Sequence, residues 1–227
     1  MADVNQILRV YGKRLSKNVR LKYLAEHAHG YKDAQEFADK AGSLLCDVLK
    51  MYMDPSTVTH EEALTIFSAV LKKNYSEVAD ICNKVQRRMY ADAGVGLNAL
   101  TPEFNAGKAR GLATAITDAE TVTDEYIKSL VVNNSRSVVD DAIRINAAAG
   151  ESVGMAVHIT RKYDDVGLHN GKDPCEWCLA REGEWDNYDE AYNAGVFERH
   201  PGCACTITYE VGKTRTWSGA GWNWHDM

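Results

Sequence analysis

The sequence predicts an α+β protein, with a mainly helical region over residues 1–160 and a small α+β domain over residues 161–227. Through the first region apolar residues recur every three or four positions, which is the spacing of amphipathic helices. After Cys205 polar and apolar residues alternate instead, which predicts a strand. The composition also changes: residues 1–170 hold 21 basic and 22 acidic side chains, whereas residues 171–227 hold 5 and 10, together with all five tryptophans. A boundary is expected where the two regions meet.

Two helices are expected before the first proline of the chain. The first has an apolar face from Ile7 onward and continues to a stop at Gly30. The second opens near Asp33 and ends at Asp54, because Pro55 disfavours a helical conformation in the residue before it.

The next long apolar pattern begins after Thr59, an expected N-cap that is followed by two glutamates in the first turn. The polar triplet at residues 74–76 is expected to divide this pattern into two helices. Residues 91–102 are expected to form a loop because they hold two glycines and a proline, and a less regular helix is expected over residues 102–119.

Thr123 is expected to cap a further helix. Asn133 and Asn134 are expected to interrupt it, and a restarted helix then closes at Gly150. Residues 153–163 mix β-branched and polar side chains, which favours a strand.

The C-terminal region is expected to be built from short elements. After the first cysteine pair we expect residues 179–185 to be the exit of a zinc hairpin that leads to a strand, and a short helix over residues 188–197. Residues 203–211 alternate in the period of two that predicts a strand, which places Cys203 and Cys205 on the same side of the chain.

This region also offers a set of metal ligands. The spacing is C-x2-C, then 21 residues, then H-x2-C-x-C, and the candidate ligands are Cys175, Cys178, His200, Cys203 and Cys205. Two thiolates from one turn and a second pair from another segment can hold a zinc ion with tetrahedral geometry. Five donors for four positions leave one spare, and either His200 or Cys203 is expected to be the fourth ligand beside Cys175, Cys178 and Cys205.

Two disulfides are the alternative use of these four cysteines. Residues 1–20 contain no apolar run that would mark a secretory signal peptide, so a reducing compartment is expected and thiolates on one zinc ion are favoured. Because the donor set is rich in thiolates and exceeds four, we expect a closed structural site with no open position for catalysis. Cys46 and Cys82 stand alone in apolar helical surroundings and are expected to be core residues.

The remaining sequence features narrow the function further. The net charge of −6 disfavours simple electrostatic capture of nucleic acid, and no stretch is apolar enough to span a membrane. His158 and His169 precede the cysteines and are expected to face solvent. Trp217, Trp222 and Trp224 are expected either to cover the core of the small domain or to anchor a partner.

The segment over residues 165–210 resembles the phage head morphogenesis family, that is, the minor head proteins related to phage Mu protein F. The matching motifs are DPCEWC, which contains Cys175 and Cys178, and HPGCACT, which begins at His200. The helical region is compatible with this family but carries no motif that matches it.

The resemblance implies a minor capsid component of a tailed bacteriophage virion, assembled in the host cytoplasm and placed near the portal or the inner capsid. It implies the portal or the major capsid protein as partner, and it does not imply an enzyme. From the acidic balance we expect weak contact at most with packaged DNA, and we expect no membrane and no small-molecule substrate. The alternative is a zinc-stapled DNA-binding module or an HNH-type nuclease. His200, Asn223 and His225 are the residues available to a nuclease, but their spacing fits no such motif, and residues 171–227 are acidic rather than basic.

Overall fold

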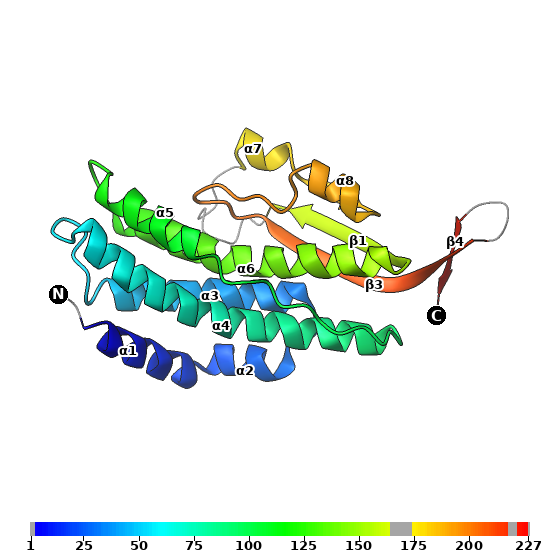
Figure 1. Ribbon diagram of the computed structural model, residues 1–227, viewed down its shortest axis with the longest axis horizontal. Helices are drawn as coiled ribbons and strands as arrows, with labels where there is room; N and C mark the ends of the chain where they lie inside the picture. The colour runs from blue at the N-terminus through cyan, green and yellow to red at the C-terminus, as the bar shows by residue number, and fades with distance from the viewer. Residues whose placement is uncertain (1–2, 164–173, 218–221, 227) are drawn as a thin grey trace.

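The computed structural model describes residues 3–163, 174–217 and 222–226, with side chains as far as Val211. Within this part of the chain, a bundle of long helices is followed by an antiparallel sheet with two short helices, so the predicted α+β class is confirmed (Figure 1). The helices of the bundle are α1 (Val4–Lys17), α2 (Val19–His27), α3 (Tyr31–Leu49), α4 (His60–Asp92), α5 (Ala106–Thr117) and α6 (Asp124–Ser152).

The sheet contains four described strands in the order β2-β1-β3-β4, with every neighbouring pair antiparallel. The elements of this region are β1 (Met155–Lys162), α7 (Glu176–Leu179), β2 (Gly183–Trp185), α8 (Tyr188–Asn193), β3 (Thr206–Trp217) and β4 (Trp222–Asp226). Strands are therefore present in the segments expected at residues 153–163 and 203–211, and α8 lies within the short helix expected after Trp185. Because β3 begins only at Thr206, Cys203 and Cys205 precede the strand that was expected to contain them.

Three helix starts follow from side chains that cap them. Thr59 and Glu62 form a reciprocal capping box at the start of α4, as its sequence predicts. Thr123 accepts a hydrogen bond from the backbone of Tyr126 at the start of α6. Asn18 ends α1 and caps α2, since its side chain accepts a hydrogen bond from the backbone of Leu21. The single helix expected before Gly30 is therefore two helices.

The break expected at residues 74–76 is wrong, because α4 runs unbroken through it. Asn74 is fully buried there, where its side chain accepts a hydrogen bond from the Tyr11 hydroxyl at 2.7 Å and donates one to the Ser135 hydroxyl at 2.6 Å. A polar side chain whose partners lie on neighbouring helices has no need to turn back on its own backbone. The asparagine therefore joins α1, α4 and α6 instead of ending a helix.

The interruption expected at Asn133 and Asn134 is also wrong, because α6 is continuous and both side chains are buried within it.

α6 lies close against α3 at Gly42, where an added Cβ would meet the Ser135 hydroxyl at 2.7 Å and the backbone of Val132 at 3.0 Å. A larger residue at that position would force the two helices apart.

The sheet and the bundle share one apolar core. The inward residues of β1 and β3, such as Val157, Ile159 and Ile207, belong to the same buried cluster as the helices. β1 packs on α6 and β3 packs on α3, which holds the sheet against the bundle. The expected boundary at residue 160 falls inside β1.

Candidate metal centre

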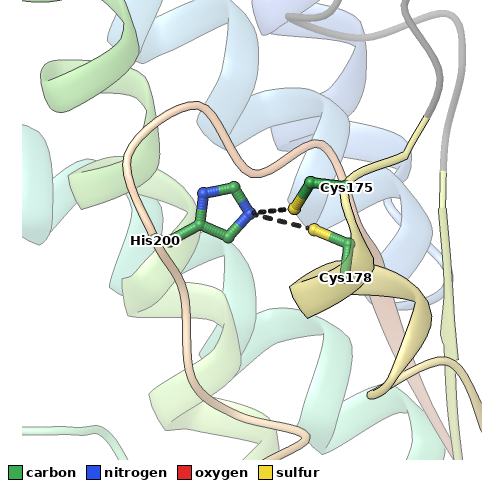
Figure 2. A group of neighbouring side chains, drawn as sticks. All are labelled: Cys175, Cys178 and His200. Carbon is green, nitrogen blue, oxygen red and sulfur yellow. Dashed lines mark hydrogen bonds between the residues drawn. The ribbon is translucent and has the colours of Figure 1, made fainter.

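The five candidate ligands come from two segments that the fold brings together above α6. Cys175 precedes α7 and Cys178 lies within its single turn, so both thiols leave the same short element. His200, Cys203 and Cys205 lie on the connection between α8 and β3. Figure 2 shows the His200 ring facing the thiols of Cys175 and Cys178.

The donor atoms are spaced as ligands of one metal ion would be. His200 Nε2 lies 3.3 Å from Cys175 Sγ and 3.0 Å from Cys178 Sγ, and Cys178 Sγ lies 3.8 Å from Cys203 Sγ. Tetrahedral bonds of about 2.3 Å to sulfur and about 2.0 Å to nitrogen place neighbouring donors roughly 3.5–3.8 Å apart. The separations found are close to this spacing, so the cluster could hold a metal.

The donors form two overlapping groups of three that share Cys178. Within each group the ligand atoms lie no more than 4.8 Å apart: Cys175, Cys178 and His200 in one, and Cys178, Cys203 and Cys205 in the other. All five residues singled out from the sequence therefore meet in one cluster.

The tautomer of His200 suits a ligand. Its Nδ1 lies 2.8 Å from the carbonyl oxygen of Pro201, which can only accept a hydrogen bond, so Nδ1 carries the proton. Nε2 then presents its lone pair to the two thiols. A backbone carbonyl on the far nitrogen is a common way to orient a metal-binding imidazole.

Cys203 is buried against positive charge. Its thiol accepts hydrogen bonds from Arg161 Nη2 at 3.5 Å and from Arg199 Nη1 at 3.8 Å, and its side chain has no exposed surface. A hydrogen bond from Cys205 and the charges of these two arginines lower the pKa of the Cys203 thiol to about 4, against the effect of burial. Burial raises the pKa of Cys178 to about 11. The pKa shifts therefore favour the thiolate form at Cys203, beside the arginines, and the protonated thiol at Cys178.

Two helices of the bundle hold the loop that carries His200 and Cys203. Asn133 of α6 donates to the His200 carbonyl oxygen at 2.6 Å, and Arg136 of α6 donates to the Cys203 carbonyl oxygen at 3.2 Å. Arg136 is itself paired through two hydrogen bonds with Asp39 of α3.

Arg199 extends this network from the loop back to the bundle. Its guanidinium forms a two-pronged ion pair with buried Asp140 of α6, which also accepts a hydrogen bond from Gln35 of α3 at 2.9 Å. The remaining Nη1 of Arg199 donates to the Cys205 carbonyl oxygen at 2.8 Å. Charge-assisted bonds of this kind are about twice as strong as neutral ones, so the loop is fixed by its backbone as well as by its ligands.

Trp177 covers the outer side of the cluster. Its ring meets the His200 ring edge to face, with centroids 4.9 Å apart, and the guanidinium groups of Arg181 and Arg161 lie 3.9 and 5.2 Å from its centroid. Cys178, Cys203 and Cys205 are at most 1% exposed beneath it, whereas Cys175 is exposed. A metal ion bound here is enclosed on most sides by protein.

The other residues considered from the sequence lie elsewhere. His158 is on β1, partly exposed, and contacts Asp186 at 2.7 Å rather than the cysteines. His169 lies outside the described residues, and so do the side chains of the C-terminal tryptophans and of Asn223 and His225. Cys46 and Cys82 are buried in α3 and α4 as expected, and all six cysteines are free of disulfides.

Comparison with protein-family models, with curated proteins and with solved structures gives no match to this chain. In the part of the chain that the structure describes, no helix combines the length and the apolar character that crossing a bilayer requires.

Proposed function

We propose that this chain is a minor head protein of a tailed bacteriophage, a non-catalytic component of the virion with one structural zinc ion. The observation that carries the proposal is the paired motif of Cys175 and Cys178 with His200, Cys203 and Cys205, which resembles the head morphogenesis family in type and order. The cluster that these residues form supports it, because their donor atoms lie close enough together to act as one ligand set.

The choice of zinc rests on the donor chemistry. Thiolate sulfur and imidazole nitrogen in a tetrahedral arrangement are the ligands of structural zinc sites, whereas calcium and magnesium take oxygen. Three of the thiols are buried, and the donors already number more than four, which favours a closed site. Zinc bound there would link α7 to the loop before β3 and so stabilise the fold.

The proposed partner is the portal or the major capsid protein of the same virion. Residues 1–150 offer several amphipathic helices without a concentrated set of catalytic side chains, and a helical bundle of this kind is suited to docking on another protein. Contact with packaged DNA is proposed to be weak beside these protein contacts, and assembly takes place in the host cytoplasm.

Quantitative mass spectrometry of purified proheads and mature particles tests the assignment. We expect the chain in both, at a few copies per particle. Its absence from both kinds of particle would remove the virion assignment. A parallel assay for magnesium-dependent cleavage of plasmid DNA addresses the nuclease alternative, and turnover at a catalytic rate would overturn the structural role.

A further inference from the structure

The outer face of α1 and α2 is basic although the chain as a whole is acidic. Residues 4–25 hold six basic side chains and no acidic one: Arg9, Lys13, Arg14, Lys17, Arg20 and Lys22. Of the chain's 26 basic and 32 acidic residues, the rest therefore keep 20 and 32, a net charge of −12. The positive charge is concentrated in one short stretch.

The helix geometry lines up three of these cations. Arg9, Lys13 and Lys17 are four residues apart along α1 and all are exposed, while Ile7, Tyr11 and Leu15 on the other face are buried. At about 1.5 Å per residue the three cations follow one another at steps of roughly 6 Å along the helix.

These side chains are available to a partner. Among the described residues, no ion pair involves Arg9, Lys13, Lys17 or the exposed Lys22 of α2. Arg20, in contrast, is held in an ion pair with Glu36. Four cations are thus left to solvent.

The acidic C-terminal region lies on the opposite side of the bundle. α1 packs on α3 and α4, and Figure 1 shows the sheet, α7 and α8 beyond α6 and away from α1 and α2. Two packed layers at about 8–10 Å each put the basic face roughly 20 Å from the sheet. Because charges are screened over about 10 Å at 0.1 M salt, the negative charge of the sheet region hardly weakens the attraction between the basic face and a negatively charged partner.

We propose that the row formed by Arg9, Lys13 and Lys17 on α1, together with the exposed Lys22 of α2, binds the phosphate backbone of double-stranded DNA without reading its sequence. A straight row of cations suits a partner with regularly repeated negative charge, which duplex DNA provides along its whole length. Lysine and arginine contacts to phosphate position a protein on DNA but carry no sequence information. The inference goes beyond the proposed function and does not depend on it, because it rests on the charge distribution alone.

The test compares two variants of the full chain that each lose one arginine and one lysine. Arg9→Gln with Lys13→Gln removes half of the proposed contacts, and Arg110→Gln with Lys128→Gln removes the same charge from exposed sites on α5 and α6. Glutamine forms helices nearly as well as either residue, so all variants should fold, which circular dichroism checks. Fluorescence anisotropy then measures binding to a labelled duplex of arbitrary sequence between about 50 and 200 mM salt.

We expect log K to fall against log salt with a slope of about −3.6 for the unaltered chain and about −1.8 for the α1 variant, at about 0.9 per phosphate contact. The control variant should keep the steeper slope and the affinity of the unaltered chain. The inference fails if the duplex does not bind at about 50 mM salt, or if both variants lose equal affinity. It also fails if polyglutamate displaces the protein as well as unlabelled DNA does, because the face would then suit an acidic protein.

Discussion

Arg136 of α6 donates a hydrogen bond to the carbonyl oxygen of Cys203, which lies 67 residues further along the chain. The same guanidinium is paired with Asp39 of α3, and it is only 2% exposed. One buried side chain therefore connects two helices of the bundle to the loop that carries three candidate metal ligands. The position of that loop depends on the bundle, and several predictions about stability and metal binding can be derived from this connection.

Replacing Arg136 with alanine should destabilise the protein and weaken metal binding together. The loss should be about 1.5–3 kcal/mol, because alanine removes the hydrogen bonds to the Cys203 carbonyl and to Asp39, whose side chain is 31% exposed and can still be hydrated. Loss of the support behind a ligand typically lowers metal affinity by about 10–100-fold. Urea unfolding and competition with a zinc chelator measure the two effects. Arg110→Ala at an exposed site on α5 is the control and should change stability by less than about 0.5 kcal/mol.

Protein purified without chelators should contain one zinc ion per chain. The donor atoms meet at spacings suited to a single tetrahedral ion, and five donors do not suffice for two complete sites. Elemental analysis together with native mass spectrometry gives the ratio. Finding no zinc, or finding a mass four hydrogens lower because of two disulfides, would contradict the metal site.

Changing Cys175 to serine should impair folding through the loss of metal. Because Cys175 is exposed, serine costs little by itself, so the expected loss of more than about 3 kcal/mol comes from the weakened site. For a chain of this size that corresponds to a melting temperature lower by about 6–12 °C.

Cys46→Ser is the matched comparison, since it changes a thiol that is fully buried in α3 and far from the cluster in sequence. It should cost about 1–3 kcal/mol through the buried hydroxyl and leave the metal content unchanged. Chelation should then lower the melting temperature of the unaltered chain and of Cys46→Ser alike, but change that of Cys175→Ser little. A normal melting temperature for metal-free Cys175→Ser would show that the metal does not stabilise the fold.

Deleting residues 214–227 should weaken incorporation into particles while zinc stays bound. The last ligand is Cys205, and the pairing of residues 206–211 with β1 lies before the deletion. β4 and residues 214–217 of the β3 segment that pairs with it would be lost, together with three of the five tryptophans. Particle composition by quantitative mass spectrometry and metal analysis of the purified chain separate the two outcomes. Normal incorporation of the shortened chain would remove the C-terminal segment as a docking element.

The sequence predicts whether a segment is a helix or a strand better than it predicts where that helix or strand begins and ends. Apolar spacing and the capping residues Thr59 and Thr123 locate the long helices correctly, because both signals are local. The two expected breaks at Asn74 and Asn133 are wrong, because each polar side chain finds its partner on a distant segment. The helix propensity of a short stretch contains no information about a hydrogen-bond partner on a distant segment.

At the candidate site, too, local patterns could be predicted from the sequence and contacts between distant segments could not. The five ligands could be found from their spacing, since paired cysteines in short turns are a local pattern. The buried arginines Arg136, Arg161 and Arg199 could not, because each is a single basic residue whose function depends on a carbonyl, thiol or carboxylate group of another segment. The run of four polar residues from Asn133 to Arg136 in the middle of α6 is a signal that points toward Arg136.

β1 packs on the bundle and also supports the loop that carries the candidate ligands, so the chain cannot be cut within β1 into two parts that fold independently. A cut at residue 160 would leave Met155–Thr160 on one fragment and Arg161, which supports Cys203, on the other. Neither fragment would keep a complete central strand, and both would expose apolar surface that the strand now covers. The cysteine-rich segment alone is therefore not expected to fold when it is fused to another protein. A fusion that binds metal would need to include α6 and the whole of β1.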